Sequence, residues 1–84
     1  MGEVEIGVVS DYFARPMVAG VDLTGEVKKG DTIRILGHTT DIEIPVNEMQ
    51  IDHAYVDEAF PGDSVGIRVP DRVRRGDKVY RATD

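Results

Sequence analysis

The sequence contains no cysteine and no tryptophan, and only three tyrosines and two phenylalanines. The lack of cysteine excludes disulfides and thiolate-ligated metals. No apolar run approaches the roughly 18 residues that a membrane-spanning helix requires, so we expect no membrane partner. The first ten residues carry acidic side chains where a signal peptide carries basic ones, which predicts a cytoplasmic chain. The 84 residues predict one domain, residues 1–84.

Basic residues are scarce and unevenly distributed. The net charge is −6, and residues 41–63 contain seven acidic residues but no lysine or arginine. Residues 64–84, in contrast, contain six basic residues. Affinity for nucleic acids depends on many cations that neutralise phosphates, so this chain is a poor general nucleic-acid binder. A local basic surface is still compatible with the sequence, as are ordinary solvated strand faces.

Apolar residues alternate with polar ones along most of the chain, as in Val4, Ile6 and Val8 or Val65, Ile67 and Val69. This period of two, rich in Val and Ile, predicts half-buried β-strands and an all-β fold. The predicted core comprises Ile6, Val8, Val21, Leu23, Ile33, Ile35, Ile44, Met49, Ile51, Val65 and Ile67.

The alternation changes parity between residues 42 and 51, which predicts a β-bulge near Asn47 and Glu48. About six strands fit the length. An open sheet of this size would leave two unpaired edges, so we predict a single closed six-stranded antiparallel β-barrel.

The dipeptide Gly-Asp occurs three times, in "VKKGDTI" (residues 27–33), "FPGDSVGI" (residues 60–67) and "VRRGDKVY" (residues 73–80). Each copy precedes an alternating apolar segment. Glycine accepts the positive φ of a tight turn, and the aspartate can accept hydrogen bonds from backbone N–H groups of that turn. Turn chemistry therefore explains Arg75-Gly76-Asp77 without an adhesion function.

Four segments in this order resemble the second, β-barrel domain of the translational GTPases, the family of elongation factor Tu and initiation factor two. They are "VAGVDLTGEVKKGDTIRILG" (residues 18–37), Val46-x-x-Met49, "EAFPGDSVGI" (residues 58–67) and "VRRGDKVY" (residues 73–80). The resemblance implies a binding module associated with translation or RNA. The stretch "GHTTDIEIPVNEMQIDH" (residues 37–53) is more closely similar to stand-alone translation-factor-like proteins. It is also similar to a barrel at the C-terminus of some collagenase-like peptidases.

The sequence lacks the Gly-x-x-x-x-Gly-Lys-(Ser/Thr) phosphate loop, so we expect no nucleotide and no GTPase activity. In elongation factor Tu the barrel helps to hold the aminoacyl end of tRNA near a turn before its second strand. The corresponding stretch here contains Arg15, which is the remaining candidate for that contact.

No constellation of residues indicates catalysis, a metal or a cofactor. The two histidines, His38 and His53, have no established metal-ligand spacing. We expect His38 to lie in a turn in which Thr39, Thr40 and Asp41 bond to the local backbone. The sequence thus predicts a protein that is not an enzyme.

Two functions remain open. The first is RNA or ribosome-associated binding, with candidate contacts that cluster if the Gly-Asp turns meet: Arg15, Lys28, Lys29, Arg68, Arg72, Arg74, Arg75 and Lys78. The second is a protein-interaction module that docks on a larger enzyme such as a collagenase-like peptidase, with Tyr55 and Phe60 as possible anchors.

Overall fold

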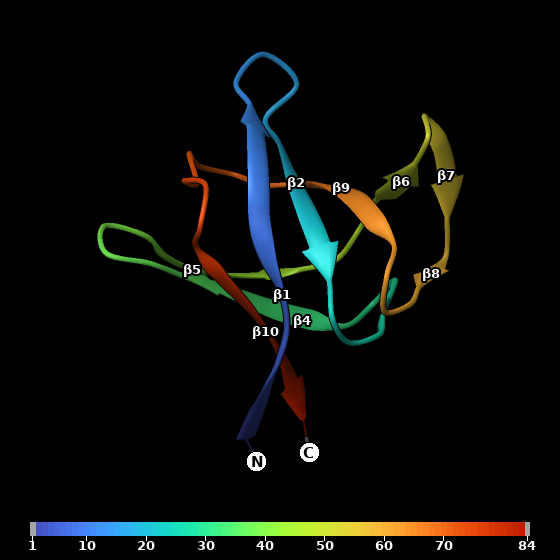
Figure 1. Ribbon diagram of the computed structural model, residues 1–84, viewed down its shortest axis with the longest axis horizontal. Coiled ribbons are helices and arrows are strands. Elements are labelled where there is room, and N and C mark those ends of the chain that lie inside the picture. The colour runs from blue at the N-terminus through green and yellow to red at the C-terminus, as the bar shows by residue number, and fades with distance from the viewer. Residues whose placement is uncertain (1, 84) are drawn as a thin grey trace.

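A computed structural model describes residues 2–83, and all regular elements in this range are β-strands (Figure 1). The all-β prediction is therefore confirmed. The strands are β1 (Gly2–Phe13), β2 (Val18–Leu23), β3 (Val27–Lys28), β4 (Thr32–Leu36), β5 (Asp41–Pro45), β6 (Met49–Ile51), β7 (Ala54–Val56), β8 (Glu58–Ala59), β9 (Ser64–Arg68) and β10 (Lys78–Thr83).

Eight strands form one antiparallel sheet in the order β5-β4-β10-β1-β2-β9-β6-β7, and β3 pairs with β8 in a separate ribbon. The sheet is not closed, since β5 and β7 are its two edges. Past the end of β5, the backbone of Val46 bonds to the turn that precedes β4 and forms no further strand ladder. Gly30 N donates to Val46 O at 2.9 Å, and Val46 N donates to Asp31 O at 2.8 Å. The predicted closed six-stranded barrel is thus not confirmed.

Strand β1 runs along two neighbours in succession. Its first half pairs with β10 and its second half with β2, with register shifts between Glu5 and Gly7 and between Val9 and Asp11. Each shift reverses which residues face inward. As a result Ile6 and Val9 are both buried, whereas Val8 is only half-buried. The prediction that Val8 belongs to the core is wrong for this reason.

The core is a single cluster of aliphatic side chains. Nine of the eleven predicted core residues are buried, and Ile51 packs against the cluster while partly exposed. The buried apolar residues that the prediction omitted are Val9, Ala19, Val27, Val46, Ala59, Val69, Val73 and Val79. Val46 lies between the end of β5 at Pro45 and the start of β6 at Met49. The parity change therefore marks a passage between two strands, and the predicted bulge at Asn47-Glu48 is wrong.

The three Gly-Asp turns share one geometry, as the sequence predicts. The φ angles of their glycines are 97° at Gly30, 95° at Gly62 and 94° at Gly76. Each aspartate carboxylate accepts the backbone N–H three residues earlier: Lys28 to Asp31 at 2.9 Å, Phe60 to Asp63 at 2.8 Å, and Arg74 to Asp77 at 2.9 Å. The Arg75-Gly76-Asp77 turn therefore has the conformation of the two turns that lack this tripeptide.

Candidate functional site

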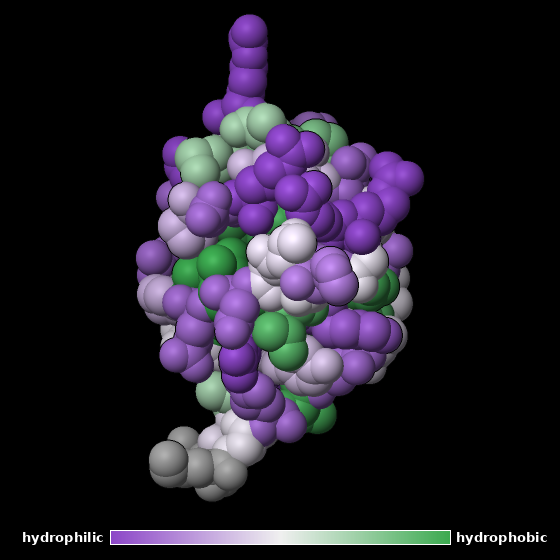
Figure 2. All heavy atoms as spheres, turned by 90° about the vertical axis from the view of Figure 1, so that its left-hand side faces the viewer, coloured by the Kyte–Doolittle hydropathy of each residue, from purple (hydrophilic) through white to green (hydrophobic). Residues whose placement is uncertain are grey.

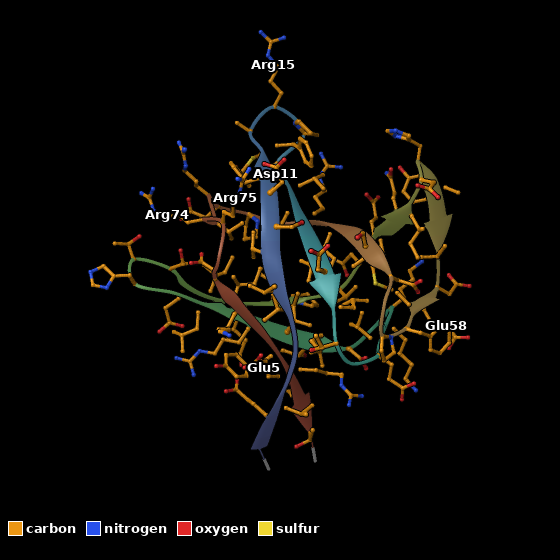
Figure 3. The ribbon with its side chains drawn as sticks, viewed as in Figure 1. Glu5, Asp11, Arg15, Glu58, Arg74 and Arg75 are labelled. Carbon is orange, nitrogen blue, oxygen red and sulfur yellow. The ribbon has the colours of Figure 1, made fainter. Side chains whose placement is uncertain are left out.

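The two turns that carry the paired cations lie on different sides of the molecule. Lys28 is opposite Glu58 in the β3–β8 ribbon. The other turn packs on β1, where Gly76 N donates to Val9 O at 2.8 Å. Figure 3 shows Arg74 and Arg75 far from Glu58, across the width of the ribbon. The structure therefore does not bring Lys28 and Lys29 together with Arg74 and Arg75.

Three of the candidate cations lie beside acidic side chains. The nitrogen–oxygen distances are 3.6 Å for Arg68–Glu48, 3.9 Å for Arg75–Asp11 and 3.8 Å for Lys78–Glu5. The guanidinium of Arg72 lies over the ring of Tyr12, 6.0 Å from its centroid. Arg15 projects alone from the tip of the β1–β2 hairpin (Figure 3). The positive charge is thus dispersed and partly offset.

His38 lies in the turn between β4 and β5, which Gly37 N closes by donating to Thr40 O at 2.7 Å. Local backbone bonds were expected from Thr39, Thr40 and Asp41, but the side chains of Thr39 and Asp41 bond to arginines. Arg74 Nε donates to Thr39 Oγ1 at 2.8 Å.

Asp41 accepts two hydrogen bonds from Arg34, at 2.9 Å from Nε and 3.0 Å from Nη2. These bonds lower the pKa of Asp41 and raise that of Arg34. The partner of Asp41 was missed by the sequence analysis, because only the β4–β5 register places Arg34 beside it.

Residues 2–83 contain no group of three or more histidine, aspartate and glutamate side chains arranged to hold a metal ion. This same range contains no helix long and apolar enough to cross a membrane. The face shown in Figure 2 is covered mostly by hydrophilic side chains, with small separate hydrophobic areas.

A groove of about 690 Å³ lies over the outer face of β1, β2 and β9. Its floor contains Gly20 of β2 and Gly66 of β9, which are direct cross-strand partners. Their strand neighbours Ala19 and Ile67 are fully buried on the other face. A second hollow of about 140 Å³ continues the floor and shares Gly66 with it. We call this continuous surface the glycine groove.

Residues of two hairpins, β1–β2 and β6–β7, line the glycine groove. Both hairpins point toward the top of the view in Figure 1. The β1–β2 hairpin contributes Phe13, which is 50% exposed, and Pro16. The β6–β7 hairpin contributes Asp52 and His53, with φ angles of 51° and 66°. Positive φ at both positions is the geometry of a type I′ turn, which costs little for glycine but strains other residues. The exposed Phe13 and the strained turn residues thus both flank the groove.

Sequence reasoning missed the glycine groove. The available signal was the parity of β2 and β9, in which Gly20 and Gly66 fall on the outward face. Only the strand order places these two glycines opposite each other.

Comparison with known proteins shows that the chain is similar to segments of proteins that are named as proteases. No family model matches the sequence. An uncharacterized protease of Methanocaldococcus jannaschii is 42% identical over 79 residues, which are 93% of this chain and 19% of that protein. A collagenase of Porphyromonas gingivalis is 36% identical over 81 residues, covering 94% of this chain and 20% of the collagenase. The chain thus spans about a fifth of the length of the curated relatives it matches.

The fold has a solved counterpart. The C-terminal domain of a Geobacillus thermoleovorans protein assigned to the U32 peptidases superimposes with a TM-score of 0.86. The match covers 93% of this chain and 91% of that domain at 16% sequence identity, so it shows a shared fold. The similarity to collagenase-like peptidases is confirmed. The predicted kinship with translation elongation factors is overturned, because the matching proteins are peptidases and collagenases.

Proposed function

We propose that this chain is a non-catalytic accessory module of a collagenase-like peptidase and that it works by binding protein. The observation that supports this most directly is the extent of the matches. They cover more than nine-tenths of this chain but only about a fifth of relatives named as proteases. A segment of that size, with the fold of a C-terminal domain of a U32-type protein, suits an appended module.

The side chains of residues 2–83 are consistent with a non-catalytic role. None of their hydrogen bonds joins a serine hydroxyl to a histidine, the arrangement that activates a serine nucleophile. Ser64, which lines the glycine groove, donates to Asp22 at 2.9 Å. The carboxylate whose pKa is lowered, Asp41, belongs to an exposed pair with Arg34. Such a pair is already satisfied and offers no acid or base for hydrolysis.

A tagged chain expressed in its source cells tests this proposal. We expect it to retain a protein of the peptidase class at moderate salt, identified by mass spectrometry after nuclease treatment. The purified chain alone should leave denatured collagen uncut. Retention of RNA without a peptidase-class protein would contradict the proposal, as would hydrolysis by the isolated chain.

A further inference from the structure

The internal packing of the domain does not by itself require a glycine at position 20 in the floor of the groove. A Cβ built on Gly7 would lie 2.6 Å from the backbone oxygen of Asp22, so the fold requires glycine there. A Cβ on Gly20 would lie 3.4 Å from Ser10 Oγ, and one on Gly66 would lie 3.1 Å from the side chain of Val18. Gly20 thus has room for a side chain, whereas a side chain at Gly66 would require Val18 to move by a few tenths of an ångström. Glycine within a strand weakens it, so a bare floor suggests close approach by another molecule.

The walls of the groove favour an apolar side chain from that molecule. Phe13 and Pro16 form one wall, and Tyr55, which is 70% exposed, lies at the far end of the adjoining hollow. Exposed aromatic rings of this kind commonly serve as anchors for a partner.

The charged residues that line the groove favour a partner with basic side chains. Asp11 and Asp52 are the acidic residues that line its larger part. Lysine and arginine are absent from that lining, although Arg75, which is not part of it, lies 3.9 Å from Asp11. The adjoining hollow adds Glu48 and Arg68, which pair with each other at 3.6 Å. An acidic groove repels the phosphates of nucleic acids and attracts lysine or arginine.

We infer that the glycine groove holds an extended polypeptide segment in which lysine or arginine alternates with apolar residues, supplied by the larger peptidase on which the module docks. This inference rests on the proposed function for the source of the segment. Alternate side chains of an extended segment point to opposite sides. The apolar set can therefore face the glycine floor. The basic side chains start on the other side of the segment, and their long flexible stems allow the charged ends to bend toward the side chains of Asp11 and Asp52.

Nuclear magnetic resonance on the ¹⁵N-labelled chain tests the inference directly. The probe is the synthetic peptide acetyl-Gly-Phe-Lys-Val-Lys-Phe-Gly-amide, and its twin carries glutamate in place of both lysines. We expect the basic peptide to shift the amide resonances of Gly20, Gln50 and Gly66. The acidic twin should bind at least about tenfold more weakly.

Two substitutions sharpen the experiment. Gly20→Val fills the floor and should weaken binding at least about tenfold, whereas Gly2→Val, at the start of β1, is the matched control and should not. Asp52→Asn removes a charge while asparagine tolerates the positive φ, and should weaken binding several-fold. Equal binding of the two peptides, shifts confined to the Arg74–Asp77 turn, or unchanged binding by Gly20→Val would overturn the inference.

The experiments distinguish failure of the inference about the groove from failure of the proposed accessory role. Concentration-dependent shifts at Gly20 and Gly66 without peptide would show that a second copy fills the groove, which also overturns the inference. If the tagged chain retains a peptidase that Gly20→Val retains equally well, the groove assignment fails and the accessory role stands. If the peptide binds the groove but no peptidase is retained, the accessory role fails.

Discussion

Gly20 on β2 lies directly opposite Gly66 on β9, and both face away from the core. On the other face of the same strands, Val21 pairs with Val65 and Ala19 with Ile67 inside the core. The outer face of the sheet therefore carries no side chains at these two positions. The pair forms part of the floor of the glycine groove, which residues of the β1–β2 and β6–β7 hairpins also line.

Replacement of Gly20 by alanine should increase stability. Alanine restricts the unfolded chain, and its Cβ would make an ordinary contact with Ser10, so we expect a gain of about 0.5–1 kcal/mol in urea unfolding. Gly7→Ala is the contrasting variant, because its Cβ would collide with the backbone of Asp22. It should lose more than about 1 kcal/mol. Equal losses in both variants would show that Gly20 is also required by the fold.

The bulges in β1 predict different costs at two adjacent valines. Val9 is 1% exposed, and Val9→Ala should lower the free energy of unfolding by about 2 kcal/mol through the loss of buried methyl groups. The half-buried Val8 should lose less than about 1 kcal/mol on the same substitution. Urea melts of the two variants measure the difference. The reverse order would contradict the register of β1.

Truncation in the centre of the core should be more damaging. Ile35 is fully buried, and Ile35→Ala should cost about 2–4 kcal/mol, enough to bring so small a domain close to unfolding. Thermal unfolding followed by circular dichroism provides the measurement. A melt that overlays the parent would contradict the assignment of Ile35 to the core.

The three Gly-Asp turns should differ in their energetic importance. Asp77 is 5% exposed and Asp31 is only half-buried, although both accept a backbone N–H at 2.9 Å. The Arg74 N–H is partly buried and the Lys28 N–H is exposed. Because a donor shielded from water is costly to leave without its acceptor, Asp77→Ala should lose about 2 kcal/mol and Asp31→Ala about 1 kcal/mol or less. Asp77→Asn retains an acceptor oxygen and serves as the control. Equal losses at both sites in urea unfolding would contradict this ranking.

The ion pair between Arg34 and Asp41 predicts a pH dependence. Hydrogen bonding to Arg34 places the pKa of folded Asp41 below its ordinary value. The pair therefore stabilises the fold above that ordinary value, and its contribution is lost as the pH falls through the lowered folded pKa.

Titration of the Asp41 carboxyl resonance should show this pKa rising toward the ordinary value in Arg34→Gln. The matched control Arg68→Gln removes a cation that pairs with Glu48 and should leave the titration of Asp41 unchanged. An unchanged pKa in Arg34→Gln would show that Arg34 does not lower it.

The candidate RNA-contact residues show which structural features local sequence patterns predict and which they do not. The sequence placed Arg74 and Lys28 at equivalent positions of equivalent turns, and the structure has both turns with the same geometry. Whether the turns meet depends on strand order, which separates them. The sequence also named Tyr55 and Phe60 as possible anchors, and both are exposed, at 70% and 47%.

Local physics sufficed for the strand-forming alternation, most of the inward residues and the three turns, because each depends on neighbours within a few residues along the chain. Only the tertiary structure decided four other features: the strand order, the open edges of the sheet, the two bulges of β1 and the pairing of Gly20 with Gly66. These features depend on contacts between segments far apart in sequence. In addition, a single inserted residue, such as the one near Ile6, exchanges the inward and outward side chains of the strand up to its next bulge. The groove exists because the fold, rather than any short motif, brings its floor and walls together.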